Sequence, residues 1–390
     1  MEEKGFEFIA PRLIFGNGRV KEAGKLAKEL KATKVFIVTD KGIVEAGLLN
    51  DLKRSLKEVD LDYRVWDKSS QNPRDDEIEG VAEAFKREKA DLLIGIGGGS
   101  PIDLTKAAGI LVTNQGPINQ YEGRNKFHNP IPPLIAIPTA SGTGTEASMW
   151  CVITDSKRNA KMSLGGPAML AKIALVDPTL TKTLPPKLTA GTGMDALSHA
   201  LESYLSTEAM PPSDALALHA IRLIAENLPR AVANGENMEA RNNMAIASFE
   251  ANLAASNTGC GCVHSLGHQL TTDFGVHHGV SMGLIMPYAM QFNTIGCIFR
   301  MRDIAEVMGR DTAGMSDREA ALQAIKTVYE LQKDVGLPTN LKQVGVKEEK
   351  IPEMSEKAFH DVDMSTNPRK ASIEDIKNIY KMALKGILET

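Results

Sequence analysis

Histidine and aspartate are concentrated in two short stretches of the second half of the chain. These are Asp195-Ala-Leu-Ser-His199, and His264-Ser-Leu-Gly-His268 followed by His277 and His278. A four-residue spacing places two side chains one above the other on a helix, so Asp195 should face His199 and His264 should face His268. A carboxylate with several imidazoles suits a borderline divalent metal such as iron(II) or zinc. A buried histidine or a helical ion pair explains any single one of these residues, but it explains the whole group poorly.

The sequence around Asp195 indicates that this carboxylate is not on an open surface. Leu197, Leu201 and Leu205 repeat at helical spacing on the segment 194–205. An isolated carboxylate near a buried face is costly, whereas one that faces a cation is stabilised. We therefore expect a metal ion beside Asp195.

A glycine-rich loop in the first half could bind a phosphate group. Gly95-Ile-Gly97-Gly98-Gly99-Ser100 ends an apolar run that begins at Asp91, and Pro101 suits the first turn of a following helix. Glycines let backbone N–H groups approach a pyrophosphate, and a helix N-terminus adds a favourable dipole. Because Ser100 stands where the dinucleotide fingerprint has its third glycine, this is not a standard Rossmann loop. A tight structural turn remains the alternative.

Further polar residues follow other β-type runs. The loop 138–146 (Pro-Thr-Ala-Ser-Gly-Thr-Gly-Thr-Glu) contains Thr139 and Thr143, whose hydroxyls could bind a sugar-phosphate. Asp40 ends the run that begins at Lys34, where it could bind ribose hydroxyls or simply cap a helix. Lys161 could reach a phosphate or ribose, or it could be ordinary solvated surface.

The elements that must position these residues differ between the two halves. Up to about residue 180, β-type runs alternate with amphipathic segments such as 75–88 and 101–112, which predicts a parallel sheet covered by helices. The expected strands are 34–40, 61–66, 91–96, 133–137, 151–154 and 173–176. After Pro185-Pro186, long helical segments dominate, with breaks expected at Pro211-Pro212, Gly235, Pro287, Pro338 and Pro368. We therefore predict an α/β domain over residues 1–183 and an all-helical domain over residues 184–390.

Composition excludes several other classes of protein. The 390 residues carry 45 basic and 49 acidic side chains, a formal net charge of −4, which leaves no electrostatic footprint for nucleic acid. No apolar run approaches the ~20 residues that span a membrane, and no signal-peptide core follows Met1. Four cysteines are no disulfide framework, and Cys260 and Cys262 are expected to be small buried residues. The default expectation is a cytoplasmic protein.

Taken together, three segments resemble the iron-containing (group III) alcohol dehydrogenase family. They are Gly97-Gly-Gly-Ser-Pro-x-Asp103, then Ala174-Leu-Val-Asp177 with 190–202 (Ala-Gly-Thr-Gly-Met-Asp-Ala-Leu-Ser-His-Ala-Leu-Glu), and His264-x3-His268 with His278-Gly279. The likeness covers essentially the whole chain, and it is closest in character to members that act on diols and aldehydes. It implies the dehydroquinate synthase-like architecture, in which a dinucleotide-binding domain precedes a helical metal domain.

The resemblance also implies particular site residues. The metal ligands would be Asp195, His199, His264 and His278, with His268 beside the substrate and His277 matched to no ligand position. The nicotinamide cofactor would contact Asp40, Asn72, Gly97, Gly98, Gly99, Ser100, Asp103, Thr139, Thr143 and Lys161. Trp150 falls near the family's pocket wall, where smaller polar residues also occur.

The implied reaction is reversible hydride transfer between NAD and a small primary alcohol, diol or aldehyde. The metal, iron(II) or else zinc, would bind the substrate oxygen, and His268 would relay its proton. Asp40 favours NAD, because a carboxylate at the ribose edge would repel the 2′-phosphate of NADP. Two alternatives stay open: a lyase or hydrolase on the same fold, and a non-catalytic NAD- or metal-binding protein. The family suggests a homodimer or larger homo-oligomer.

Overall fold

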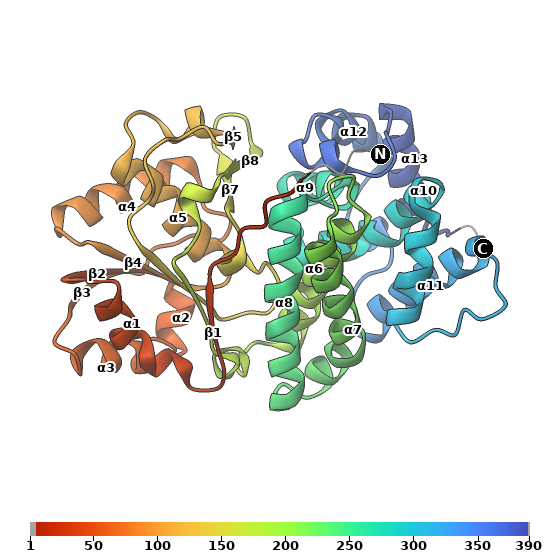
Figure 1. Ribbon diagram of the computed structural model, residues 1–390. Coiled ribbons are helices and arrows are strands. Elements are labelled where there is room, and N and C mark those ends of the chain that lie inside the picture. The colour runs from red at the N-terminus through yellow and green to blue at the C-terminus, as the bar shows by residue number, and fades with distance from the viewer. Residues whose placement is uncertain (1–4, 389–390) are drawn as a thin grey trace. The chain divides into compact units, whose positions relative to one another are not determined.

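A computed structural model describes residues 5–388, which fall into two compact units. One unit is Ile9–Thr183; of the described residues, the other contains 5–8 and 184–388. The first is an α/β unit and the second is helical (Figure 1). The expected class of fold, a parallel-sheet α/β domain followed by a helical domain, is confirmed.

A six-stranded parallel sheet forms the centre of the α/β unit, with strand order β1-β9-β6-β4-β2-β3. Its strands are β1 (Arg12–Phe15), β2 (Lys34–Val38), β3 (Asp62–Trp66), β4 (Leu92–Gly97), β6 (Leu134–Pro138) and β9 (Ile173–Val176). The helices are α1 (Ala23–Glu29), α2 (Lys41–Glu45), α3 (Asn50–Lys57), α4 (Asp75–Arg87) and α5 (Gly99–Thr113). β4 and β6 are buried along their whole length, as expected for a sheet covered on both faces.

Alternate side chains of β2 show how the two faces are filled. Phe36 and Val38 belong to the apolar cluster that contains residues of α4 and α5, and Val35 and Ile37 belong to the cluster that contains residues of α1 and α3. α4 and α5 accordingly lie on one side of the sheet, and α1 and α3 lie on the other (Figure 1). Because helices cover both faces of the sheet, the loops with polar residues lie at the carboxyl ends of the strands.

Two features of the α/β unit differ from the sequence prediction. The run 151–154 does not join the parallel sheet, because β7 (Trp150–Asp155) pairs antiparallel with β8 (Ala160–Gly165) in a separate three-stranded sheet with β5 (Gly123–Arg124). Both β1 and β8 were missed. β1 is only four residues long, and β8 contains Lys161 and Ser163 instead of a β-type run, so cross-strand pairing and not local propensity defines them.

The helical unit contains eight α-helices in its described part. They are α6 (Pro186–Leu205), α7 (Pro211–Ala233), α8 (Met238–Thr258), α9 (Cys262–Phe274), α10 (His278–Val307), α11 (Asp317–Asp334), α12 (Ile351–Phe359) and α13 (Ile373–Lys385). A short 3-10 turn, η8 (Val362–Thr366), precedes α13. Among the residues described, no helix is both long and apolar enough to cross a membrane.

The predicted break at Pro287 is wrong, since α10 continues through this proline and departs from helical geometry only at Cys297. A proline inside a helix costs about 3 kcal/mol. Leu284, Ile285 and Tyr288 around it are completely buried, and each buried side chain of this kind contributes about 1.5–3 kcal/mol. Packing therefore outweighs the lost backbone hydrogen bond.

Candidate metal centre and cofactor loops

Close contacts between helix backbones bring the histidine-rich segments together. Asp195 and His199 lie on α6, His264 and His268 lie on α9, and His278 is the first residue of α10. A Cβ atom added at Gly279 would lie 2.0 Å from the carbonyl oxygen of Gly191, so only glycine allows α10 to approach α6 this closely. That approach places His278 beside Asp195.

The five side chains form one cluster. Asp195, His264 and His278 offer ligand atoms that all lie within 4.8 Å of one another. The ring of His199 lies 4.5 Å from that of His264, measured between centroids, and its ligand atom groups with those of His264 and Cys260. The ring of His268 stacks on that of His278 at 5.5 Å.

Hydrogen bonds orient two of the imidazoles. His199 Nδ1 donates to the backbone carbonyl of Asp195 at 3.0 Å, and His264 Nδ1 donates to Glu202 Oε2 at 2.5 Å. With Nδ1 protonated in each ring, Nε2 carries a lone pair. Such second partners fix the tautomer and the direction of metal-binding histidines. Glu202, one turn after His199 on α6, is therefore a site residue that the sequence prediction missed.

Unsatisfied atoms at the centre of the cluster test its fit to a cation. His264 Nε2 is buried without a hydrogen-bond partner, and Asp195 Oδ1 makes no hydrogen bond, although it lies 3.3 Å from His278 Nε2. A buried polar atom without a partner costs about 1–3 kcal/mol. A divalent ion would satisfy both atoms, so the residues present fit a metal.

The protonation states agree with this fit. Burial lowers the pKa of His199 to about 4 and that of His264 to about 3, so both rings are neutral near pH 7. Burial alone would raise the pKa of Asp195, but the facing imidazoles of His278, His199 and His264 hold it below its usual range. A carboxylate and neutral imidazoles are the ligand forms that metal binding requires.

His268 has carboxylate partners on another segment. Its Nδ1 donates to Asp361 Oδ2 at 2.9 Å, and Asp363 Oδ2 lies 3.8 Å away, both carboxylates belonging to the Asp361-Val-Asp363 stretch at η8. Burial raises the pKa of Asp363 to about 7. The two aspartates were missed because they lie at least 93 residues after His268, and no local pattern links the two segments. His277 Nδ1 is buried and has no hydrogen-bond partner.

The glycine loop of the α/β unit occupies the turn from β4 to α5. Gly98 is the residue before the first turn of α5, and a Cβ atom added there would meet nothing within 4 Å. At Gly99, an added Cβ would lie 2.8 Å from Thr143, and Thr139 N donates to the Gly97 carbonyl at 2.8 Å. The two loops that the sequence singled out therefore meet at neighbouring strand ends, and Gly98 leaves open space there for a phosphate.

A chain of polar contacts connects other expected cofactor residues. Asn72, in a left-handed conformation with φ of 60°, donates through its backbone N–H to Ser100 Oγ at 3.3 Å. Lys161 Nζ donates to Asn72 Oδ1 at 2.8 Å. Burial lowers the pKa of Lys161 to about 8, so this lysine is not ordinary solvated surface. The structure thus brings Ser100, Asn72 and Lys161 together.

Asp40 and Asp103 have structural partners in addition to any role with a cofactor. Asp40 accepts a hydrogen bond from Ile43 N at 3.0 Å and caps α2, which is the alternative that the sequence left open. Asp103 accepts from Thr145 Oγ1 at 2.6 Å and from Val152 N at 3.0 Å, so both of its oxygens are already engaged. Asp40 thus caps the N-terminus of α2, and Asp103 connects α5 to the neighbouring loop and to β7.

Lys106 completes this fastening and was missed by the sequence analysis. It is fully buried, and its Nζ donates to the carbonyls of Thr145, Ser148 and Trp150 at 2.6–2.8 Å, and to Thr145 Oγ1 at 3.0 Å. We call Asp103 and Lys106 the α5 clamp. The three-residue spacing from Asp103 to Lys106, which places both on one helix face, was the available signal in the sequence. The ring of Trp150 packs on Gly165, where an added Cβ would lie 2.1 Å from it.

Comparisons with known proteins agree with this architecture. Residues 10–178 match the iron-containing alcohol dehydrogenase family, and residues 189–384 match its C-terminal part. The chain is 41% identical to the NAD-dependent methanol dehydrogenase of Bacillus methanolicus, over 97% of this chain and 99% of that protein. It is 38% identical to 1,3-propanediol dehydrogenase of Citrobacter freundii (98% and 100% covered) and 36% identical to lactaldehyde reductase of Escherichia coli K12 (95% and 97% covered).

Solved structures give the same result. A crystal structure of 1,3-propanediol oxidoreductase superposes with a TM-score of 0.95 at 37% identity, covering 97% of this chain and all of that one. The fold and the clustered site thus define a metal-dependent alcohol dehydrogenase. The chain belongs to the iron-containing alcohol dehydrogenase family, which confirms the resemblance drawn from the sequence, including its likeness to diol- and aldehyde-acting members. Neither the lyase or hydrolase alternative nor the non-catalytic one is supported.

Proposed function

We propose that this chain catalyses reversible NAD-dependent oxidation of a small primary alcohol or diol to the aldehyde. The observation that carries the proposal is the pair of buried, unsatisfied ligand atoms, His264 Nε2 and Asp195 Oδ1, among neutral imidazoles. The names of the relatives, which include methanol, 1,3-propanediol and lactaldehyde enzymes, support small primary alcohols and their aldehydes as substrates.

One divalent ion would be held by Asp195, His199, His264 and His278, the set that the family resemblance implies. Iron(II) is the first candidate because of the family, and zinc is the second because imidazole and carboxylate suit both. When bound, the metal supplies Lewis-acid polarisation of the substrate oxygen. Glu202 keeps the His264 ring oriented, and the carbonyl of Asp195 does the same for His199.

NAD would bind at the loops of the α/β unit and carry the hydride. Gly97–Ser100 would present backbone N–H groups to the pyrophosphate, while Thr139, Thr143, Asn72 and Lys161 would add polar contacts. Asp40 would accept hydrogen bonds from the ribose with the carboxylate oxygen that does not cap α2. Asp103 would act mainly through the α5 clamp, because both of its oxygens already have protein partners.

His268 is proposed to relay the alcohol proton. Its Nδ1 is held by Asp361, which fixes the ring orientation and leaves Nε2 as the atom that can exchange a proton. Replacing His268 with Ala should leave the metal in place and lower kcat about 10²- to 10⁴-fold, the usual contribution of general acid–base catalysis. Loss of the metal in this variant would show that His268 is a ligand instead.

The test of the whole proposal is an assay of metal-reconstituted protein. The chain is stripped with a chelator, reloaded anaerobically with iron(II) or zinc, and supplied with NAD and a series of primary alcohols and diols. Reduction of NAD that depends on added metal supports the proposal, and NAD reduction that is unchanged by chelation contradicts it. The expected homodimer or larger assembly and the cytoplasmic location stay predictions.

A further inference from the structure

One ligand-type side chain beside the metal cluster has no place in the proposed ligand set. Cys260 lies in the turn between α8 and α9, four residues before His264. Its Sγ groups with one ring nitrogen of His199 and one of His264, all three atoms within 4.8 Å of one another. Cys260 is only partly buried, contrary to the expectation of a small buried residue, and all four cysteines are free thiols.

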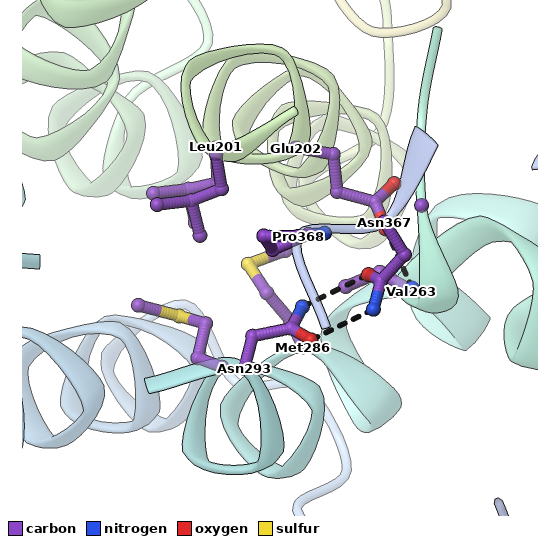
Figure 2. Close-up of a pocket in the computed structure, with 10 residues that line it drawn as sticks. Leu201, Glu202, Val263, Met286, Asn293, Asn367 and Pro368 are labelled. Carbon is purple, nitrogen blue, oxygen red and sulfur yellow. Dashed lines mark hydrogen bonds between the residues drawn. The ribbon is translucent and has the colours of Figure 1, made fainter. Parts of the chain in front are cut away.

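The turn that carries Cys260 is held in place from both sides. A Cβ atom added at Gly259 would lie 2.6 Å from Thr366 Oγ1, and one added at Gly261 would lie 2.9 Å from Asn367 Oδ1. Thr366 also donates to the Cys260 carbonyl at 2.5 Å, and Asn367 Oδ1 accepts from Cys262 N at 3.1 Å. Asn367 is in turn paired with Asn293 at 2.8–3.0 Å (Figure 2). The turn that carries the thiol is therefore fixed by hydrogen bonds to Thr366 and Asn367.

A second observation at the same place points to a ligand. His264 is 4% exposed, and its Nε2 has no hydrogen-bond partner. A divalent ion beside this nitrogen could also bind the sulfur of Cys260 as a thiolate, because a coordinating thiol is deprotonated.

We propose that Cys260 is a further ligand of the divalent ion, alongside His199 and His264, and that its sulfur moves the metal preference of the site from iron(II) toward zinc. The proposal rests on the metal site proposed above. Ligation forms a metal–sulfur bond, displaces one bound water and releases the thiol proton to solvent. Thiolate is a soft ligand that favours zinc, whereas the rest of this site offers only imidazole and carboxylate.

The experiment uses the full chain reconstituted with Co²⁺, whose bond to thiolate gives a charge-transfer band in the near ultraviolet. The wild type should show this band, Cys260→Ser should lose it while still binding Co²⁺, and Cys297→Ser should keep it. Cys297 is a matched control because it is also a partly buried thiol, and its Sγ donates to the Asn293 carbonyl at 3.2 Å, away from the cluster.

A second measurement needs no spectroscopic assignment. Wild type and Cys260→Ser are exposed to equal concentrations of zinc and iron(II) without oxygen, and the bound metals are counted. The ratio of zinc to iron should fall about tenfold or more in the variant, because the soft thiolate that favours zinc is replaced by a hydroxyl. Stoichiometric Co²⁺ without the band, or an unchanged ratio, would overturn the role of Cys260 alone. Failure to bind any divalent ion would overturn the metal site itself.

Discussion

The metal cluster of the helical unit and the α5 clamp of the α/β unit differ in how completely their buried polar atoms are hydrogen-bonded. In the cluster, Asp195 Oδ1 and His264 Nε2 are buried without hydrogen bonds. In the α/β unit, Lys106 has four acceptors, and both oxygens of Asp103 are engaged. The cluster lacks partners that a cation would supply, whereas the clamp is fully paired. Beside the clamp, Ser141 Oγ and Glu146 Oε2 of the loop 138–146 are buried without hydrogen bonds, and Gly98 presents open backbone. Metal binding should therefore stabilise the helical unit strongly. In the α/β unit, mutations should separate cofactor binding from folding.

The largest expected effect is the loss of a central ligand. His264→Ala should lose bound metal and at least about 99% of activity, because each ligand is needed to complete the shell. It should also lose the stabilisation that metal gives the wild type, which is about 4 kcal/mol at a metal concentration a thousand times the Kd. Metal analysis and thermal unfolding with and without chelator measure both. His360→Ala is the control, because this exposed histidine forms its ion pair with Glu356. Full metal content in His264→Ala would refute the ligand role.

Breaking the α5 clamp should affect the scaffold without affecting the metal. Lys106→Met leaves the carbonyls of Thr145, Ser148 and Trp150 without their donor, and each buried acceptor left unsatisfied costs about 1–3 kcal/mol. Urea unfolding should show this loss, and the KM for NAD should rise, while metal content stays normal. Lys86→Met, which removes only one carbonyl contact at Leu111, serves as a milder control. A stable variant with normal KM would show that the clamp does not support the loops.

Filling the open space at Gly98 should weaken the binding of the cofactor and leave the fold intact. Gly98 has a φ of −70° that valine adopts readily, and an added Cβ meets no atom within 4 Å. In Gly98→Val, affinity for NAD should fall at least about tenfold, since the branched side chain occupies the approach to the helix N-terminus. Fluorescence titration with NADH measures the affinity, and unchanged unfolding in urea is the internal control. Unchanged affinity would return this loop to a purely structural role.

Asp40 should determine the choice between NAD and NADP. Like charges at contact distance cost of order 1–4 kcal/mol at a partly exposed site. Asp40→Gly should therefore strengthen the binding of NADP more than it weakens the binding of NAD. The ratio of kcat/KM values for the two cofactors should shift about tenfold or more toward NADP. Asp40→Asn keeps an oxygen that can cap α2 and removes only the charge, so it separates the two functions. If neither variant moves the ratio, Asp40 is only a helix cap.

The smallest effect concerns pH. Burial lowers the pKa of Lys161 to about 8, so its positive charge is present below that pH and is lost above it. Affinity for the anionic cofactor should accordingly fall severalfold as the pH rises from about 7 to about 9, within the 1.5–3 kcal/mol of a charge-assisted hydrogen bond. Lys161→Arg stays charged throughout and should flatten this dependence. An equally steep fall in the arginine variant would assign the effect to another group.

Much of the architecture could be read from local patterns. Apolar runs such as 92–96 and 134–137 are strands in the structure, and the amphipathic segment 75–88 is α4, because burial against neighbours follows the period of the side chains. The local pattern failed to predict the structure at positions where contacts with distant segments determine it. β8 is a strand because β7 lies beside it, and Pro287 stays inside α10 because the surrounding core holds it.

For the site, the sequence by itself determined which residue types were available and at what helical spacing. Asp195 with His199 and His264 with His268 were singled out because a four-residue interval aligns side chains on one helix face. Only the tertiary structure decided their partners. Glu202 reaches His264 across 62 residues, Asp361 reaches His268 across 93, and Lys106 reaches Trp150 across 44. These contacts depend on how closely helices and loops pack, as at Gly279 against Gly191, and no local periodicity encodes that distance.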